Sequence, residues 1–507
     1  MENLLHTARV PVTRTVVDAR DEYVISGDYV LPEYCPDMAV VLKCRITPRI
    51  QSRRRNGDQL LLEGTALVCV LYLDEERRCV REAEFSQPLS CALRGAGGAE
   101  TEPVRITLTP EYVNCRATGP RRLEVRGAFA VHAQADAAEQ ISLAEAAEDP
   151  ALYVQTVEVP VSAPVASAEK MLMISDVLEF DGDLPPAEQL LGGDDTVVVQ
   201  ECKLLTGKAI VKGQILVHRL YTDDSSRGTT HLLDYTVPFS QIVDLDGARD
   251  GMQAIAEVSV LSDTVRCVAD PAGQNRMLEI GYKLSVQVQV YDSRAVSLIT
   301  DAYHSRYPSV PERQGLTLRA LTGTQRQTAT LGRDLDLPSD TLQEILDIRV
   351  GVTPLACRCE GGKAKPGGRL AVSLLVRDND GIVSYYERPE EFELEYAADG
   401  NTAEVSMAVT DVRYAVAGGK LNLRVTLLVT LCLWDVTQPQ AVTGVTLRED
   451  QPYPPERAGI KLYFAGSGER VWDIARHCHA SPAGICAEND LNGESLAEPC
   501  VLLIPLT

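Results

Sequence analysis

The sequence lacks the features by which the common enzyme classes and membrane proteins are recognised. It contains no GxxxxGK[ST] phosphate loop, no HExxH zinc motif and no GxSxG nucleophile turn. No segment approaches the roughly 18 consecutive apolar residues that cross a bilayer. The first residues, Met1 to Arg9, contain no basic segment followed by an apolar core. We therefore expect a cytosolic, non-enzymatic protein without a transmembrane segment or a secretory signal.

Cysteine is present but follows no framework spacing. The 14 cysteines include no CxxC, and Cys357 and Cys359 form the closest pair. Together with the missing signal, this indicates reduced thiols in a cytosolic protein. The densest group of thiol and imidazole side chains lies near the C-terminus and comprises His477, Cys478, His479, Cys486 and Cys500. Its spacing fits no zinc pattern, so we predict no metal site and no cofactor.

The chain has fewer basic residues than acidic residues. The chain has 49 Lys and Arg against 72 Asp and Glu, which gives a formal net charge of −23. This charge argues against nucleic acid or an anionic membrane surface as a direct partner, and it allows a basic protein partner. The 507 residues are enough for about three to four domains of ordinary size.

Internal repetition is visible in short motifs. Leu-Pro occurs at Leu31, Leu184 and Leu337, so the spacing is 153 residues both times (184 − 31 and 337 − 184). A glycine precedes an apolar run that ends ten residues later in an aspartate, at Gly64 with Asp74, Gly213 with Asp223, and Gly368 with Asp378. Repetition at a fixed period indicates repeated structural units. We interpret the recurring aspartates as turn residues that cap their own backbone; a hydrolytic site is the alternative.

Long segments of alternating hydrophobicity follow in each copy. They comprise Leu123, Val125, Phe129, Val131 and Ala133; Leu278, Ile280, Tyr282, Leu284, Val286, Val288 and Val290; and Leu421, Leu423, Val425, Leu427, Val429, Leu431 and Leu433. Alternation of period two predicts strands with one buried face in antiparallel sheets. Asn56-Gly57, Asp380-Gly381 and Gly418-Gly419 predict hairpin turns. We also expect a short helix over Ser339–Asp347 and an exposed helix or linker over Ala135–Asp149.

The C-terminal 47 residues form a compact unit after a proline-rich joint. Lys461–Phe464 is predicted to be a strand, and Val471, Ile474, Ala475 and Cys478 share one face of a two-turn helix. Ser481-Pro482 starts a second short helix as an N-cap followed by proline. Val501–Ile504 is the closing strand. We therefore predict a small βααβ module over residues 461–507.

The fold class that follows is mainly β. We predict three tandem antiparallel β-rich repeats, over residues 1–150, 151–316 and 317–450, followed by the βααβ module. Proline-rich spacers, such as Tyr453-Pro454-Pro455, are expected to hold neighbouring units apart semi-rigidly.

The module resembles a LysM domain, a small glycan-binding module, in its residues 468–475, 487–491 and 503–505. The sequence differs from that family at Glu469-Arg470 and at Glu498-Pro499-Cys500, in the two loops that border the sugar groove of LysM domains. Proline in place of glycine changes the dihedral angles that a loop can adopt. We therefore predict that the module binds a protein rather than a glycan.

The whole chain resembles a second family. Leu31-Pro32, Cys35-Pro36-Asp37-Met38, the segment from Gly64 to Tyr72 and the Phe-Ser-Gln at Phe85 and Phe239 resemble SPOCS domains. Tandem SPOCS repeats that end in a LysM domain resemble the spore coat morphogenetic proteins. The resemblance implies a scaffold in the mother-cell cytosol at the forespore surface, which links the basement-layer sporulation ATPase to other coat proteins. The alternative is a protein that binds peptidoglycan or chitin-type glycans through the module.

The partner-binding residues are predicted in the module. Trp472 lies off the centre of the apolar helix face, where an indole can anchor a partner; core packing is the alternative. The surrounding loops complete the predicted site, which comprises Trp472, Glu469, Arg470, Glu488, Asn489, Asp490 and Leu491.

Overall fold

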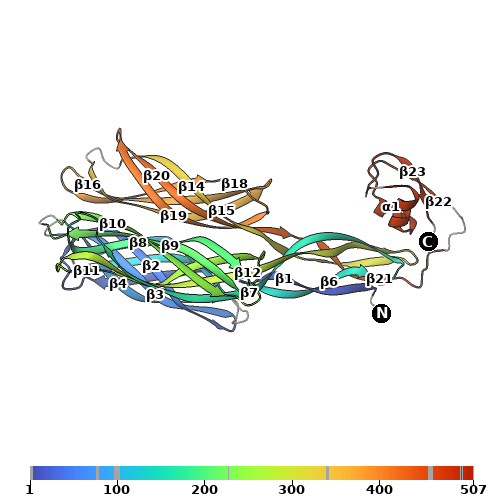
Figure 1. The fold of residues 1–507 in the computed structure, drawn as a ribbon, viewed down its shortest axis with the longest axis horizontal. Coiled ribbons are helices and arrows are strands. Elements are labelled where there is room, and N and C mark those ends of the chain that lie inside the picture. Colours follow the sequence, from blue (N-terminus) through green and yellow to red (C-terminus); the bar gives the residue numbers. More distant parts are fainter. Residues whose placement is uncertain are drawn as a thin grey trace.

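A computed structural model describes residues 4–75, 79–95, 103–225, 228–337, 342–454, 461–491, 493 and 495–505. Within these residues the chain is mainly β, with two short helices near its C-terminus, as the sequence predicts. Figure 1 shows an elongated molecule with a broad β-rich body at one end, a narrow stalk, and the C-terminal module at the other end. No helix among the described residues is long and apolar enough to cross a membrane.

The first third of the chain forms two three-stranded antiparallel sheets. One has the order β1-β6-β5 (Leu5–Val30, Arg122–Ala147, Arg105–Gly119), and the other has the order β2-β3-β4 (Met38–Asn56, Gln59–Asp74, Val80–Arg94). We call this pair of sheets lobe 1.

The next segment repeats this layout. Lobe 2 has one sheet of order β7-β12-β11 (Leu152–Glu179, Asn275–His304, Gln253–Ala269) and one of order β8-β9-β10 (Ala187–Leu205, Lys208–Asp223, Thr230–Asp244).

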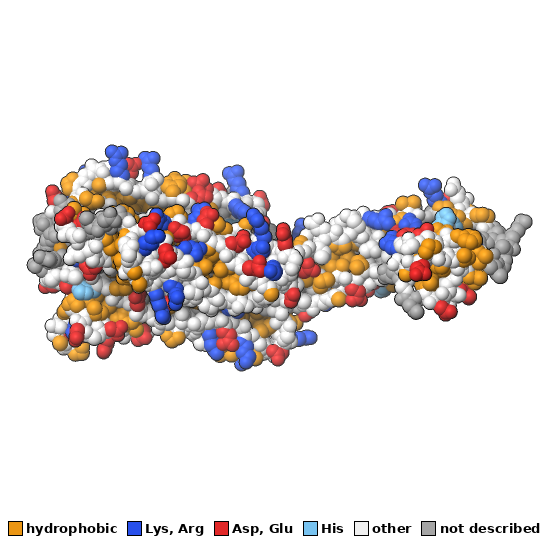
Figure 2. Space-filling model, turned by 90° about the horizontal axis from the view of Figure 1, so that it is seen from above, with side chains coloured by type: hydrophobic (Ala, Val, Ile, Leu, Met, Phe, Trp, Pro, Cys, Tyr) orange, Lys and Arg blue, Asp and Glu red, His pale blue; other side chains and the backbone are white. Residues whose placement is uncertain are grey.

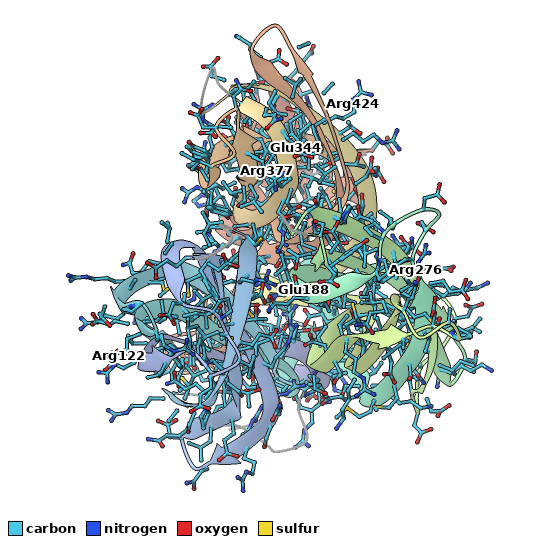
Figure 3. All side chains as sticks on the ribbon, turned by 90° about the vertical axis from the view of Figure 1, so that its left-hand side faces the viewer. Arg122, Glu188, Arg276, Glu344, Arg377 and Arg424 are labelled. Atoms are coloured by element: carbon cyan, nitrogen blue, oxygen red, sulfur yellow. The ribbon has the colours of Figure 1, made fainter. Side chains whose placement is uncertain are left out.

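Lobe 3 has the same layout with two additions. Its sheets are β14-β20-β19 (Leu318–Asp336, Lys420–Thr437, Thr402–Ala417) and β15-β16-β17 (Leu342–Glu360, Lys363–Asp378, Val383–Glu393), with β18 (Tyr396–Ala397) paired to β16. A separate ribbon pairs β13 (Ser309–Gly315) with β21 (Gln440–Leu447). Seen end-on in Figure 3, the three lobes surround a common centre.

The central strands β6, β12 and β20 carry the alternating segments. Every apolar residue that the sequence assigns to their buried faces is at most 2% exposed, which confirms the strand prediction. Leu123, Leu278 and Leu421 each lie near the start of one of these strands. Burial of one such side chain contributes roughly 1.5–3 kcal/mol, so these faces form the main cores of the lobes.

Two predictions of local structure are wrong. The first expected an exposed helix or linker over Ala135–Asp149, but residues through Ala147 continue β6 and pair with β1. The Ala- and Glu-rich composition suits either state, and the partner strand decides it. The second expected a helix over Ser339–Asp347, but Leu342 to Asp347 lie in β15. Register shifts between Leu342 and Glu344 and between Ile345 and Asp347 produce a spacing that resembles a helical period. Residues 338–341 lie outside the described part.

The recurring aspartates cap turns, as predicted. Asp74, Asp223 and Asp378 end β3, β9 and β16. The Asp223 carboxylate accepts from the backbone N–H of Thr229 at 2.9 Å, and that of Asp378 accepts from Ile382 at 2.7 Å. Asp74 accepts from the backbone N–H of Cys79 at 3.3 Å. These contacts explain why an aspartate recurs at the end of each of these strands.

The stalk consists of three ribbons that extend from the lobes. They are the outer ends of the pairs β1/β6 and β7/β12, and the separate pair β13/β21. Apolar side chains from all three, including Leu5, Ile299 and Val442, pack together in its interior. The stalk carries the C-terminal module away from the body (Figure 1).

Candidate functional site: the C-terminal module and its dock

The module has the predicted order of elements. It comprises β22 (Lys461–Ala465), α1 (Val471–Cys478), α2 (Pro482–Glu488) and β23 (Cys500–Ile504), and β22 pairs with β23 in antiparallel register. Helix α2 starts as predicted, because the Ser481 hydroxyl accepts from the backbone N–H of Gly484 at 3.1 Å. Val471, Ile474, Ala475 and Cys478 are buried in the module core, which confirms the predicted apolar helix face.

Trp472 joins the module to the stalk. Its indole Nε1 donates to Asp301 Oδ2 at 2.9 Å, and its ring packs edge-on against Tyr303 with centroids 5.0 Å apart. Asp301 and Tyr303 lie at the end of β12. Only 8% of Trp472 remains exposed. The sequence left core packing open as the alternative for this side chain, and the structure shows that packing.

Asp301 is the electrostatic centre of the contact, which we call the dock. Arg476 of α1 donates to the same Oδ2 atom at 2.8 Å, and Arg313 of β13 donates to Oδ1 at 2.7 Å. The Asp301 side chain is 16% exposed, so these charge-assisted bonds are partly shielded from water. The dock therefore ties the module to two of the three ribbons.

Tyrosine side chains complete the dock. Tyr303 donates its hydroxyl to the backbone carbonyl of Ala480 at 2.6 Å, and burial raises its pKa. Tyr453 stacks on His479, with ring centroids 3.6 Å apart. His479 ends α1 in the left-handed conformation with φ of 54°. His479, which the sequence analysis grouped with possible metal ligands, is thus a helix cap that stacks on the Tyr453 ring.

A groove of about 750 Å³ separates the module from the stalk. It is lined by Arg470, Trp472 and Leu491 on the module side and by Tyr153 to Thr156 of β7 on the stalk side. Trp472 and the loop that follows α2 therefore meet in one groove. Strand β7 forms the facing wall.

The other predicted site residues fall into two groups. Arg470, Glu488 and Asp490 are exposed, and Arg470 forms a bidentate pair with Asp473 at 2.9 and 3.1 Å. Asn489 and Leu491 are half-buried. The Asn489 amide bonds to the backbone of Ile485 and Leu503 at 2.8 Å, so it fixes α2 to β23.

The remaining member, Glu469, is half-buried and lies in the loop before α1. Its backbone carbonyl accepts from the Leu496 N–H at 2.9 Å. Glu469 therefore links the loop before α1 to the segment around Leu496.

The module also exposes apolar side chains that sequence reasoning did not single out as a surface. Leu462, Phe464 and Val501 are 56%, 78% and 51% exposed, and Phe464 pairs directly with Val501 across the two strands. Figure 2 shows apolar side chains gathered on the module, beside charged side chains of both signs. The alternation of β22 could have indicated this face.

Polar side chains occupy the centre between the lobes, which sequence reasoning also missed. Each lobe contributes one charged residue at an equivalent position. The partner residue across the strand pair lies five residues before the recurring aspartate in each lobe. The three pairs are Arg45 with Cys69, Asp194 with His218, and Arg349 with Ser373. Asp194 pairs with Arg45 at 2.5 Å and with Arg349 at 3.5 Å. Although burial opposes it, these two cations lower the pKa of Asp194. One residue from each lobe thus contributes to a single cluster of charges.

Further ion pairs join the lobes in pairs. Arg81 of lobe 1 binds Glu188 of lobe 2 at 3.1 Å, and Glu188 lies near the common centre in Figure 3. His218 of lobe 2 binds Asp347 of lobe 3 at 2.9 Å. The lobes are therefore held together by buried and half-buried charges as well as by apolar contact.

One possible metal-binding group occurs among the described residues. Ligand atoms of Cys69, Glu82 and Glu84 lie within 4.8 Å of one another. Burial raises the pKa of the Cys69 thiol to about 12, and Arg45 contacts the thiol. A protonated thiol beside a guanidinium is a poor metal ligand. The group is better explained as part of the polar contact between lobes.

Comparison with known proteins identifies one segment. The family model described as SipL, SPOCS domain matches residues 186–267, which run from the start of β8 almost to the end of β11. No curated protein and no solved structure matches the chain. Residues 186–267 are thus similar to a SPOCS domain. The SPOCS family is a coat-assembly family and not a known enzyme family, and the match suggests a role in spore coat morphogenesis.

Proposed function

We propose that the protein is a non-enzymatic scaffold of the spore coat, which docks on the basement-layer sporulation ATPase at the forespore surface and binds other coat proteins. The observation that carries the proposal is the SPOCS match at residues 186–267, within lobe 2. The architecture suits this role, since lobes joined by ion pairs and a stalk hold a small module at a distance from the body.

We further propose that all three lobes are SPOCS-like repeats. Lobes 1 and 3 have the same sheet layout as lobe 2, with β6, β12 and β20 in the central position. Equivalent positions on β2, β8 and β15 supply Arg45, Asp194 and Arg349. The pairing of β13 with β21 supports a boundary between the second and third repeats before Ser309 rather than after Leu316. Residues 461–507 are the LysM-like module.

The module is proposed to bind the ATPase rather than a glycan. Strand β7 already lies along the groove that contains Trp472 and Leu491, which leaves less room for a sugar chain. Of the residues that differ from the LysM pattern, at Glu469-Arg470 and Glu498-Pro499, Arg470 lines this groove. The exposed Arg470, Glu488 and Asp490 are the side chains that a partner can reach directly, while Trp472 sets the position of the module.

Reversing the two acidic charges at the end of α2 tests this surface. The double variant Glu488→Lys with Asp490→Lys is expected to bind the purified ATPase about tenfold more weakly in a calorimetric titration, because complementary charges at an interface would become like charges. The matched control is Asp334→Lys with Asp336→Lys, since these residues are also acidic, exposed and two positions apart, but lie on β14.

The control separates local from long-range effects, because both doubles change the net charge equally. Equal weakening by the two doubles, or no weakening by either, contradicts the proposed surface. Tight binding of the full chain to chitin oligomers, abolished by the α2 double variant, would favour the glycan-binding alternative.

A further inference from the structure

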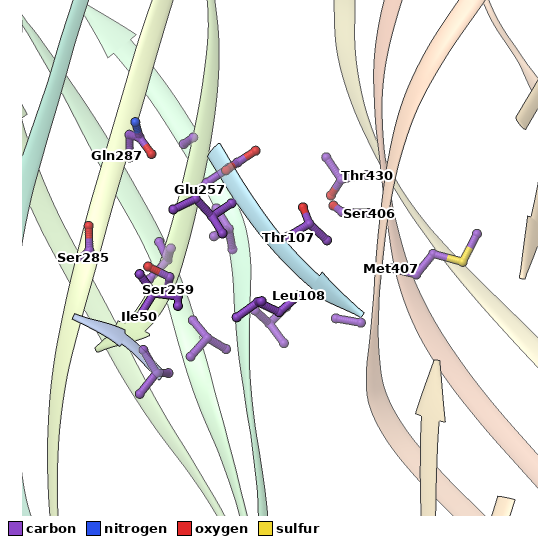
Figure 4. A pocket seen from close by; sticks show the side chains of 18 of the residues that line it. Ile50, Thr107, Leu108, Glu257, Ser259, Ser285, Gln287, Ser406, Met407 and Thr430 are labelled. Atoms are coloured by element: carbon purple, nitrogen blue, oxygen red, sulfur yellow. The ribbon is translucent and has the colours of Figure 1, made fainter. Parts of the chain in front are cut away.

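A cavity of about 480 Å³ lies where the three lobes meet, away from the module. Figure 4 shows side chains from each lobe around it: Ile50, Thr107 and Leu108 from lobe 1, Glu257, Ser259, Ser285 and Gln287 from lobe 2, and Ser406, Met407 and Thr430 from lobe 3. Its size is within the range of small-molecule sites. The wall is apolar at several points and polar at others.

Two buried hydrogen-bond donors in the wall have no partner among the described residues. They are Nε2 of Gln287 and Nε of Arg326. Gln287 is only 8% exposed, so its amide cannot rely on bulk water. Buried donors without acceptors are rare in folded proteins, because each one costs its lost hydration. The two atoms come from lobes 2 and 3 and line the same space.

The other cations of the wall already have partners. Arg49 pairs with Asp263 at 3.0 Å, and Arg53 pairs with Glu169 at 2.7 Å. The acidic side chain of the wall, Glu257, lies 3.6 Å from Arg105. The donors left over are therefore a guanidinium and an amide, and an acceptor that carries negative charge suits both.

We propose that this cavity binds a small organic carboxylate. The planar guanidinium of Arg326 matches the geometry of a carboxylate, and the Gln287 amide supplies a further donor. Ile50 and Leu108 offer apolar contact to the body of the ligand, whereas the Met407 side chain points toward the core of lobe 3. Inorganic phosphate would satisfy the donors but leave Ile50 and Leu108 without a contact. The ligand would bridge lobes 2 and 3 and would stabilise their junction by mass action.

The test is a calorimetric titration of the full chain with benzoate, with chloride and inorganic phosphate at equal ionic strength as comparisons. Benzoate is expected to bind and to raise the thermal unfolding midpoint, whereas chloride and phosphate do neither. Arg326→Met and Gln287→Met should each weaken benzoate binding about tenfold, since each removes a donor to a charged acceptor. Arg424→Met is the matched control, because Arg424 is exposed on β20 of the same lobe.

Circular dichroism shows whether each variant remains folded, and the two variants come from different lobes, so one loss of folding leaves the other informative. Absence of benzoate binding would mean that water alone fills the cavity and would overturn the proposal. The proposal would also be overturned if both cavity variants bound benzoate with unchanged affinity, or if the Arg424 variant lost as much benzoate affinity as they do. Phosphate binding as tight as benzoate binding would refute the assignment to an organic carboxylate. This proposal is independent of the proposed ATPase contact.

Discussion

Replacing Trp472 by alanine is expected to release the module from the stalk. The change removes a bond to Asp301 and the edge-on packing against Tyr303, and truncation of a buried tryptophan typically costs about 3–5 kcal/mol. The lobes should stay folded, since Trp472 contacts β12 only at its stalk end. Hydrogen exchange measured by mass spectrometry should show faster exchange in α1 and at the end of β12, with unchanged exchange in β6 and β20.

Phe464→Ala is the matched control, because it removes an aromatic side chain of the same module that is 78% exposed. Its effect on stability should stay within about 0.5 kcal/mol. Unchanged exchange at the end of β12 in the Trp472 variant would show that the dock does not exist in solution.

The Trp472→Ala variant also tests the sequence-based prediction that Trp472 contacts the partner. We expect its affinity for the ATPase to fall by roughly thirtyfold, which corresponds to about 2 kcal/mol. Asp301→Ala distinguishes the two explanations, because it weakens the dock without altering the module. A similar loss in both variants indicates that the docked position matters, whereas a loss in the Trp472 variant alone indicates direct contact.

The contact of His218 with lobe 3 makes stability depend on pH. Burial lowers the pKa of His218, but hydrogen bonds to Asp234 at 2.6 Å and to Asp347 at 2.9 Å outweigh burial and raise the pKa to about 9. Arg349, the neighbouring cation on β15, opposes this rise. An unfolded histidine has a pKa of about 6.5. The folded pKa is the higher one, so the stabilisation is complete below about pH 6.5 and disappears as the pH rises through about 9.

The expected loss is roughly 3 kcal/mol between pH 6 and pH 9.5, from about 1.4 kcal/mol for each unit of pKa difference. Urea unfolding followed by circular dichroism measures it, and His218→Gln should flatten this part of the profile. His132→Gln is the control, because His132 pairs with Asp18 at a more exposed site, where the side chains are 32% and 58% exposed. If the unfolding free energy fell equally steeply with pH in the wild type and in the His218→Gln variant, His218 would not be the source of the pH dependence.

The sequence predicts the strands well because their pattern is local. Each buried face in β6, β12 and β20 consists of apolar residues at alternate positions, and a strand is the conformation that places such residues on one side. The order of elements in the module follows for the same reason, since the Ser481-Pro482 helix start and the Val471–Cys478 stripe are short-range signals. Turn glycines such as Gly57 and Gly381, which adopt positive φ, mark the hairpins.

The position of Trp472 could not be predicted, because its partner is Asp301, 171 residues earlier in the chain. The same holds for Arg45, Asp194 and Arg349, whose proximity depends on how three lobes pack around one centre. Leu342 and Ile345 misled the prediction of a helix, because bulges in β15 gave them helical spacing. In each case contacts between distant segments decide the outcome, and local periodicity contains no information about them.

The most direct test of the account is an affinity pull-down from sporulating cells with the full chain and with a chain that lacks residues 461–507. We expect the full chain to retain the sporulation ATPase and the shortened chain to lose it, while circular dichroism shows the β-rich body of both to be folded. Equal recovery of the ATPase by the two chains would contradict the proposal that the module, positioned by the dock, is the part that binds it.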